Sequence, residues 1–284
     1  MNYTNKIFNV LKYILLIAIL VIMVFPLIYA FFASFKTNLE IMTDSGKLLP
    51  NKFTLDNYRT IFDPANNFNF SRMTLNSLYL TVVSIIISLG LSTTIAYVYV
   101  RGVFKGKKIV FACLMSIMFI TTGGLTVYPT FNIYKVLHIP IGLNALIFRG
   151  LFNIPVAHFL LVSGYVKAIP IGMDEAAEID GCGFIERYWR IILPNLKTIL
   201  ATLTILAFNG NWNSYLVPAM YTASVPEQQT LMVGLMSLKN STESASNWGL
   251  LLAGSMIAIL PVMIVFLFFN RYITESIVGS SVKG

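Results

Sequence analysis

Charged side chains are scarce in this sequence. Asp, Glu, Lys and Arg make up 11% of its 284 residues, whereas a soluble globular domain has about 25%. Hydrophobic residues make up 56% of the chain, and they lie in uncharged runs that are long enough to cross a bilayer. This composition excludes an ordinary soluble domain and indicates one helical membrane domain over residues 1–284.

Residues that carry redox, metal or nucleotide chemistry are also rare. Cys113 lies in an uncharged run and Cys182 in a loop expected in the cytoplasm, so we predict no disulfide. His138 and His158 stand far apart, without Cys, His or carboxylate at metal-ligand spacing, so no metal site is predicted. The sequence lacks a Gly-x-x-x-x-Gly-Lys-Ser/Thr phosphate loop, and this chain is therefore expected to bind no ATP or other cofactor.

Acidic residues are outnumbered by basic ones, 12 against 20, which gives a net charge of +8. A basic patch on a folded surface would suggest a nucleic-acid partner, but these bases lie in short loops between apolar runs. Lys and Arg in such loops are retained on the cytoplasmic side during membrane insertion. The charge therefore predicts an orientation in the membrane and no nucleic-acid partner.

Six runs with little or no charge reach the length of about 20 residues that a helix needs to cross the hydrocarbon core. They cover residues 13–35, 74–100, 109–134, 145–166, 198–221 and 248–270. The fourth run contains Arg149 near its start, which either pairs within the helical bundle or extends toward the membrane surface. We therefore predict an all-α membrane protein with six transmembrane helices.

The loops set the orientation of these spans. The basic residues Arg101, Lys105, Lys107 and Lys108 crowd the link between the second and third runs, which is therefore expected in the cytoplasm. An even number of spans then places both termini there as well. The first run exceeds the about 7–15 residues of a signal-peptide core and lacks an Ala-x-Ala cleavage site, so we predict that it is a retained span.

Two long loops are expected on the outer side of the membrane. The first, near residues 36–73, contains Pro50, Asp56 and Pro64, which favour turns and short helices over a folded domain. The second, near residues 222–247, is rich in Ser, Thr, Asn and Gln. It serves either as a solvated connector or as a docking site for a partner.

The segment between the fourth and fifth runs, residues 168–195, differs from the other loops, and we call it the elbow segment. Pro170 and Gly172 end the preceding run. The acidic residues Asp174 and Glu175 suit the positive end of a helix, and the two alanines that follow are good helix formers. The elbow segment is therefore predicted to begin with a short helix outside the membrane.

The second half of the elbow segment is predicted to form another helix. Gly181 and Gly183 end the first helix, and residues 184–192 then combine apolar and charged side chains in the manner of an amphipathic helix. The small side chains near the turn would let a partner protein approach closely, and the neighbouring carboxylates would orient it. The expected shape is a helix, a turn and a second helix.

The elbow segment resembles the cytoplasmic signature of the permease subunits of bacterial ABC importers. That signature runs Glu-Ala-Ala, three residues, Gly, nine residues and Ile-x-Leu-Pro. The matching residues of this chain are Glu175, Ala176, Ala177, Gly181, Ile191, Leu193 and Pro194. The resemblance implies that the elbow segment contains a coupling helix, between the fourth and fifth spans, that docks into a cleft of an ATPase subunit.

The resemblance also implies the details of this contact and the partners. Residues 175–183 would form the contact together with Asp174, and Glu175 and Asp180 would be its polar anchors. Cys182 and Gly183 depart from the family pattern, where Ala and Ser are usual, without adding much bulk. The implied assembly lies in the bacterial cell membrane and contains a second homologous permease, two ATPase domains that bind ATP and Mg, and an extracytoplasmic solute-binding protein.

Further stretches resemble the carbohydrate importers of this family, and in particular the shorter of their two permeases. These stretches are residues 54–58, Asn76-Ser77, Ala96-Tyr97, residues 104–108, residues 212–215 with Pro218, Arg271-Tyr272 and Lys283-Gly284. The resemblance implies a maltose-type inner-membrane permease that translocates a sugar or oligosaccharide. The alternatives are an ABC importer for another solute class, or an ion-coupled secondary transporter, which needs ionisable residues that the spans almost lack.

Trp212, Asn213 and Tyr215 are candidate substrate contacts near the end of the fifth run. Sugars pack on aromatic rings and hydrogen-bond to amides, so these residues either line the translocation pathway or belong to an aromatic belt at the membrane surface. The carboxylates of the elbow segment, Asp174 included, are expected on an exposed helix with nothing to desolvate them. Acid–base catalysis is therefore not expected, and the chain is predicted to have no catalytic centre.

Overall fold

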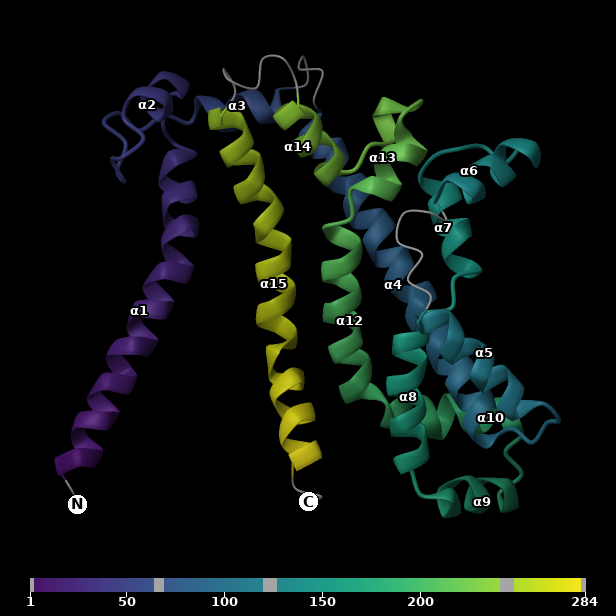
Figure 1. The fold of residues 1–284 in the computed structure, drawn as a ribbon. Helices are drawn as coiled ribbons and strands as arrows, with labels where there is room; N and C mark the ends of the chain where they lie inside the picture. The colour runs from purple at the N-terminus through teal and green to yellow at the C-terminus, as the bar shows by residue number, and fades with distance from the viewer. Residues whose placement is uncertain (1–2, 64–68, 120–126, 241–247, 282–284) are drawn as a thin grey trace. The chain divides into compact units, whose positions relative to one another are not determined.

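The computed structural model describes residues 3–63, 69–119, 127–240 and 248–281 (Figure 1). The chain forms two compact units. The first unit comprises residues 1–71 and 234–260, and the second comprises residues 72–233 and 261–284.

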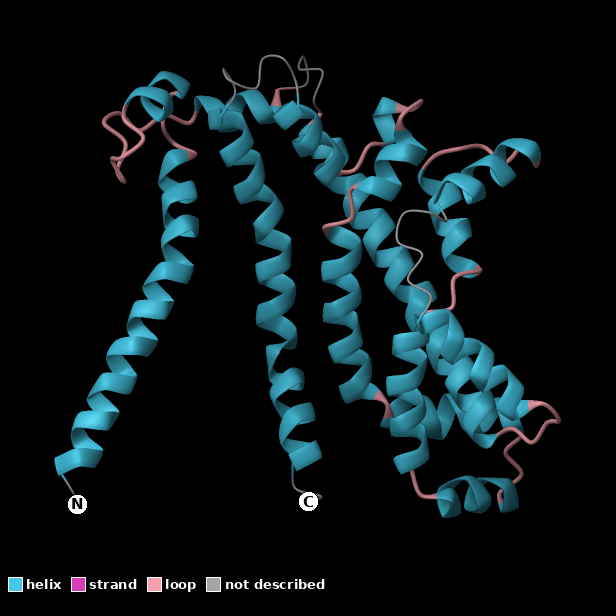
Figure 2. Ribbon diagram, viewed as in Figure 1, coloured by secondary structure: helices cyan, strands magenta, loops and turns pink. Residues whose placement is uncertain are grey.

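Helices make up all the regular secondary structure in the described part of the chain (Figure 2). In chain order they are α1 (Tyr3–Ala33), α2 (Asn38–Thr43), α3 (Asp56–Phe62), α4 (Phe70–Arg101), α5 (Lys107–Phe119), α6 (Val127–Val136), α7 (Leu143–Leu151), α8 (Val156–Ala168), α9 (Ile171–Ile179), α10 (Phe184–Arg187), η2 (Tyr188–Ile192), α11 (Leu193–Asn195), α12 (Lys197–Trp212), α13 (Leu216–Thr222), η3 (Pro226–Gln228), α14 (Leu231–Asn240) and α15 (Trp248–Ser281). Helices suit an apolar chain in lipid because they satisfy backbone donors and acceptors within one segment.

Three of these helices are long and apolar enough to cross a membrane, namely Phe8–Ala33 of α1, Phe70–Arg101 of α4 and Trp248–Asn270 of α15. Two bent pairs pass the same test together. α7 and α8 meet at 45°, and Phe184–Asn195 meets α12 at 76°. The described residues therefore hold three to five candidate spans, which confirms an all-helical membrane-spanning chain, while the number six stays a prediction.

The predicted third, fourth and fifth spans differ from the helices that the structure contains. Residues 120–126 of the third lie outside the described residues, between α5 and α6. The fourth is interrupted between α7 and α8, where Pro155 precedes the first residue of α8. The fifth is interrupted between α12 and α13, and Pro218 lies in the first turn of α13. Proline is tolerated at these positions because a first turn has no intrahelical acceptor for its N–H.

In the first unit, side-chain hydrogen bonds link the end of α1 to the segment that contains α2 and α3. Nδ2 of Asn57 donates to the carbonyls of Ser34 at 2.8 Å and Lys36 at 2.9 Å. Nζ of the buried Lys36 donates to the carbonyl of Lys47 at 2.5 Å. The short helices predicted for the loop near residues 36–73 are confirmed by α2 and α3.

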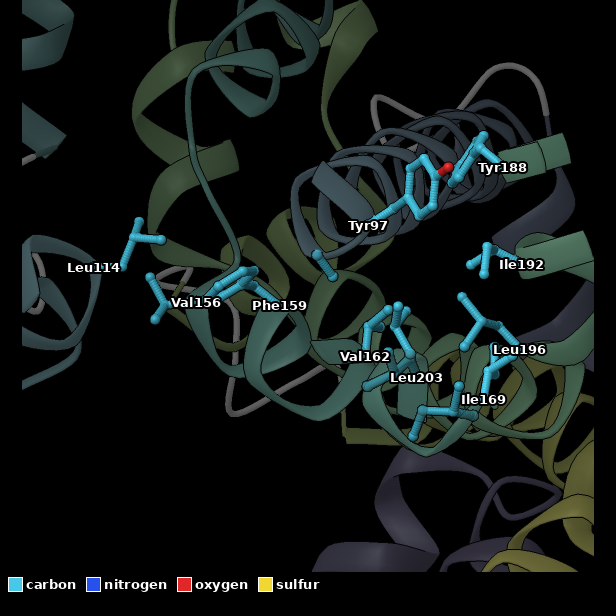
Figure 3. Packing of buried hydrophobic residues seen from close by; sticks show 13 residues of the cluster. Tyr97, Leu114, Val156, Phe159, Val162, Ile169, Tyr188, Ile192, Leu196 and Leu203 are labelled. Carbon is cyan, nitrogen blue, oxygen red and sulfur yellow. The ribbon is translucent and has the colours of Figure 1, made fainter. Parts of the chain in front are cut away.

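The main apolar core lies in the second unit and joins α4, α5, α8, the elbow segment and α12 (Figure 3). The residues labelled in the figure are Tyr97, Leu114, Val156, Phe159, Val162, Ile169, Tyr188, Ile192, Leu196 and Leu203. In a bilayer such residues gain little from leaving the lipid, whose tails are as apolar as leucine, so close packing supplies the attraction. This packing links the elbow segment to the helices of the unit.

The residues between α13 and α14 contact the starts of α4 and α7. Nδ2 of Asn76 donates to the carbonyls of Glu227 and Gln229, each at 2.9 Å. Oε1 of Gln228 accepts the backbone N–H of Leu143 at 2.8 Å and so caps the first turn of α7. This part of the predicted loop near residues 222–247 is therefore an ordered bridge between two helices.

Candidate functional site

Arg101, the last residue of α4, links this helix to the start of α9. Its Nη2 donates to the carbonyl of Ile169 at 2.7 Å. Its Nε lies 2.9 Å from Oδ2 of Asp174, a separation that makes an ion pair although the contact lacks the angle of a hydrogen bond. Asp174 is only 4% exposed, and loss of either partner of a buried ion pair leaves the other charge uncompensated. The end of a candidate span therefore holds the first helix of the elbow segment.

The exposed position that the sequence predicted for Asp174 is wrong. Asp174 and Ala177 are both buried in the second unit, as expected for residues three apart on one face of a helix. Glu175, Ala176 and Glu178 are exposed on α9. Asp174 thus orients α9, and its neighbours form the surface that a partner could contact.

Gly181 ends α9 with a backbone conformation that favours glycine. Its φ is 87°, in the left-handed region where an L side chain is strained. The N–H of Cys182 donates to the carbonyl of Ala177 at 2.8 Å, and that of Gly181 donates to the carbonyl of Glu178 at 3.1 Å. These two bonds form a Schellman motif. Gly183 has an ordinary φ of −69° and begins the second helix, so its small size is not a backbone requirement.

Two tyrosines link the second helix of the elbow segment to α4. The hydroxyl of Tyr97 donates to the carbonyl of Phe184 at 2.9 Å, and the hydroxyl of Tyr188 lies 2.8 Å from Oγ1 of Thr93. The ring of Tyr97 also packs on the rings of Phe184 and Tyr188, with centroids 4.5 Å and 5.4 Å away. Both tyrosines are buried, so these hydrogen bonds avoid unsatisfied polar groups. α4 therefore contacts both helices of the elbow segment.

The second helix contains a π-helical turn, η2, beside the Leu-Pro pair of the signature. The N–H of Leu193 donates to the carbonyl of Tyr188, five residues earlier. Pro194 has no N–H to donate, and the side chain of the next residue, Asn195, donates through Nδ2 to the carbonyl of Ile191 at 2.7 Å. The π-helical turn thus ends two residues before the proline, which lies in the first turn of α11. Leu193 is half-buried and Pro194 is exposed, so these signature residues shape the turn.

The elbow segment exposes large apolar side chains beside polar ones. Ile179, Ile185 and Trp189 are 87%, 73% and 61% exposed. The same segment exposes Glu175, Ala176, Glu178, Asp180, Gly181 and Gly183. An apolar centre with polar surroundings is typical of protein interfaces. An ion pair between Glu178 and Arg187, at 2.8 Å, links the two helices that carry these residues.

Sequence reasoning missed several contributors to this arrangement. Arg101 was interpreted as an orientation signal alone, although a basic residue at the end of a span can pair with an acidic residue of a neighbouring loop. Ile179 and Ile185 flank the glycine-containing turn, and large apolar residues beside a turn were the available signal for an exposed apolar surface. Among the described residues, no group of three or more His, Cys, Asp or Glu is placed to hold a metal ion.

A cavity of about 220 Å³ lies in the second unit, at the breaks between α7 and α8 and between α12 and α13. Its walls come from the middle of α4, from the break between α7 and α8, and from the break between α12 and α13. The polar side chains that line it are Ser84, Ser88, Arg149, Asn153, Asn211 and Ser214. Polar groups that converge between membrane helices are typical of a ligand site.

The predicted substrate contacts are sequence neighbours of residues that line this cavity. Trp212 is buried and stacks on the phenylalanine four residues earlier, with ring centroids 5.5 Å apart. Asn213 is exposed and Tyr215 is half-buried. The cavity is lined instead by their neighbours Asn211 and Ser214. The part played by Trp212, Asn213 and Tyr215 in substrate binding stays a prediction.

Long apolar helices, a polar cavity lined at the breaks between α7 and α8 and between α12 and α13, and an exposed elbow segment are features of a helical membrane transport protein. The family model described as the inner membrane component of binding-protein-dependent transport systems matches residues 102–278. This chain belongs to that family.

Relatives of the chain are similar over nearly their whole length. The arabinooligosaccharides transport system permease protein AraQ of Halalkalibacterium halodurans is 32% identical over 267 residues, which cover 93% of this chain and 92% of that protein. The inner membrane ABC transporter permease protein YcjP of Escherichia coli is 32% identical over 266 residues, 93% of each chain. A chain in the crystal structure of a bacterial ABC transporter involved in alginate import has a TM-score of 0.80 at 22% identity, with 96% of this chain and 98% of that chain covered. The fold is therefore that of an ABC importer subunit.

Proposed function

We propose that this chain is a permease subunit of an ATP-driven ABC importer and translocates a sugar or oligosaccharide. Family membership supports an importer, and a relative named for arabinooligosaccharide transport supports a carbohydrate substrate. The observation that carries the proposal is the elbow segment, which exposes Glu175 and Ala176 and is linked to α4 through Arg101 and Asp174. A partner that moves this surface would also move a membrane helix.

The proposed topology is one membrane domain over residues 1–284 with six spans. In this topology the chain lies in the cell membrane of a bacterium. The elbow segment and both termini face the cytoplasm. Support comes from the three long apolar helices, from the two bent pairs and from the basic residues between α4 and α5.

The proposed partners are a second homologous permease, two ATPase domains and an extracytoplasmic solute-binding protein. ATP and Mg are bound by the ATPase domains, and this chain holds no cofactor. Ile179 and Ile185, together with the exposed residues of α9, would enter a cleft of one ATPase domain. Closure of that domain would then be transmitted through α9 and its ion pair to the end of α4.

Two substitutions in the elbow segment test this coupling. Glu175→Lys reverses an exposed charge, and Gly183→Trp adds bulk at a position with open space and an ordinary φ. Asp56→Lys, at an exposed position in α3, is the matched control. The measurements are sugar uptake and binding-protein-stimulated, vanadate-sensitive ATPase activity in proteoliposomes that contain the whole importer.

Both elbow variants should insert and assemble normally. Their rate of sugar uptake should fall at least tenfold, and the binding protein should no longer stimulate their ATPase activity. The Asp56→Lys importer should match the wild type within about twofold. Normal uptake by both elbow variants would show that the elbow segment does not couple ATP hydrolysis to transport. Solute flux driven by protons or sodium, without ATPase activity, would contradict the importer itself.

A further inference from the structure

Arg149 differs from the other arginines whose side chains the structure describes. Five of these, Arg59, Arg72, Arg101, Arg187 and Arg190, lie between 2.8 and 3.7 Å from a carboxylate oxygen. The guanidinium of Arg149 has neither an ion pair nor a hydrogen bond with any described residue. Its side chain is half-buried and lines the cavity between the interrupted helices.

The sequence gives Arg149 no acidic neighbour in the walls of this cavity. Residues 64–173 contain no Asp or Glu, and neither do residues 187–226. All the residues that line the cavity come from these two stretches. A cation within a candidate membrane span is costly and marks a substrate or ion pathway. The cavity walls offer it no negative charge, so an anionic partner for Arg149 would come from outside them.

The rest of the lining suits a hydroxylated ligand. Ser84, Ser88, Asn153, Asn211 and Ser214 bring hydroxyl and amide groups to the same cavity as Arg149. A guanidinium binds a carboxylate through two parallel hydrogen bonds, and hydroxyl and amide groups exchange hydrogen bonds with sugar hydroxyls. The cavity, at about 220 Å³, is smaller than the roughly 300–1,000 Å³ of sites that enclose a whole drug-sized ligand. It therefore suits one ring or one substituent of an oligosaccharide.

We infer that this cavity binds a carboxylate of the transported molecule through Arg149, and that the substrate is an oligosaccharide containing a uronic acid. This inference rests on the proposed function, because it concerns the cargo of the importer. The serines and asparagines of the cavity would contact the ring hydroxyls, while Arg149 would select the acidic sugar over a neutral one.

The test combines the solute-binding protein with the whole importer. Thermal shift of the binding protein is measured with trimers of galacturonate, glucuronate and mannuronate, and with neutral galactotriose and maltotriose. Uptake of the trimer that binds is then measured in proteoliposomes for the wild type, Arg149→Gln, Arg149→Lys and Ser84→Val. Lys135→Gln is the matched control, since Lys135 is an exposed cation that lies over the ring of Phe131 and does not line the cavity.

The expected result is a shift with a uronate trimer and a loss of at least tenfold in its uptake for Arg149→Gln. Arg149→Lys should retain part of the uptake, because it keeps the charge without the two-pronged geometry. Ser84→Val should also reduce uptake, because it narrows the cavity and removes a hydroxyl, while the charge is intact. The Lys135→Gln importer should stay within about twofold of the wild type.

The inference is overturned if the binding protein recognises only neutral trimers, or if Arg149→Gln imports the uronate trimer at the wild-type rate. Weaker assembly of Arg149→Gln with the second permease, measured by size-exclusion chromatography, would assign a carboxylate of that partner to Arg149 and would also overturn it. In each of these cases ATP-driven sugar import can still stand. If the assembled importer hydrolyses ATP but imports none of the trimers bound by the binding protein, the proposed function itself is wrong.

Discussion

Asp174 illustrates how one side chain can change the interpretation of a short motif. In the sequence it belongs to a run of carboxylates that suits an exposed surface. In the structure it is buried beside Arg101, so its charge acts within the chain. Glu175, the next residue, points to solvent. The two adjacent acidic residues therefore have separate roles, one in positioning α9 and the other on its surface.

The ion pair between Arg101 and Asp174 should stabilise the second unit. Removal of one partner of a buried pair costs roughly 3 kcal/mol, so Arg101→Gln and Asp174→Asn should each lower the thermal stability of the purified importer. The double variant should lose less than the sum of the two, as measured in a double-mutant cycle followed by tryptophan fluorescence.

Glu186→Gln is the control for this cycle, because its partner Arg190 is exposed and an exposed pair contributes about 0.5 kcal/mol or less. Strict additivity of the Arg101 and Asp174 variants would show that the two charges do not interact.

Gly181 and Gly183 provide a matched pair of substitutions. Gly181→Ala places a side chain at a φ of 87° and should cost about 1–2 kcal/mol. Gly183→Ala, at a φ of −69° with open space around it, should cost close to nothing. The measurement is hydrogen exchange at the C-terminal end of α9, which should become faster in the first variant alone. Equal exchange in both variants would contradict the left-handed conformation of Gly181.

At the scale of elements, α4 contacts both helices of the elbow segment, so we expect the three helices to move together. α4 contacts α9 through Arg101 and contacts the second helix through Tyr97 and Tyr188. A displacement of either helix of the elbow segment would therefore also displace α4. The core around Ile192 adds apolar packing to these polar links.

Removal of the tyrosine hydroxyls should loosen this attachment without removing the rings. Tyr97→Phe deletes one hydrogen bond, and Tyr188→Phe deletes the bonds with the hydroxyls of Thr93 and Thr94. A hydrogen bond is worth about 1 kcal/mol, so amide exchange in residues 184–195 should rise roughly fivefold or more in each variant. Tyr128→Phe, at an exposed position, is the control and should leave the exchange unchanged. If the Tyr97 and Tyr188 variants behave like this control, their hydroxyls do not stabilise the elbow segment.

Sequence reasoning identified apolar runs more reliably than helix ends. Hydropathy alone locates α1, α4 and the first part of α15, because each is a single uninterrupted run. It did not locate the breaks at 152–155 and 213–215, because hydropathy averaged over about 20 residues hides single polar residues such as Asn153 and Ser214. The helix, turn and helix of the elbow segment were predicted because Pro170 and Gly181 are strong local signals. The burial of Asp174 depends on Arg101, which is 73 positions away, and no local pattern encodes that contact.

At the scale of the whole molecule, much apolar surface has to be covered by lipid or by another protein. None of the most apolar window of α1 is buried within this chain, and its side chains from Phe8 onward are mostly exposed. A helix of this kind is stable where the solvent itself is apolar. The length of its apolar stretch, 26 residues, exceeds the ~20 that a span requires.

The orientation of the chain can be tested by cysteine labelling in spheroplasts. In a Cys113→Ala and Cys182→Ser background, Asp56→Cys should react with a membrane-impermeant maleimide from outside. Glu178→Cys should react only after the membrane is opened. Both positions are exposed in the structure, so accessibility depends on the side of the membrane. Reaction of Glu178→Cys in sealed spheroplasts would place the elbow segment outside and end its assignment to an ATPase.

The π-helical turn at Tyr188–Ile192 changes which way the side chains after it face. An α-helix advances by about 100° of rotation for every residue, so the one additional residue of a π turn rotates everything after it by roughly that angle relative to everything before it. Deletion of one residue from this turn would restore regular winding at the cost of this offset. α11 and α12 would then present a different azimuth to α4 and α8, and the number of residues between Gly181 and Pro194 would no longer match the packing on either side.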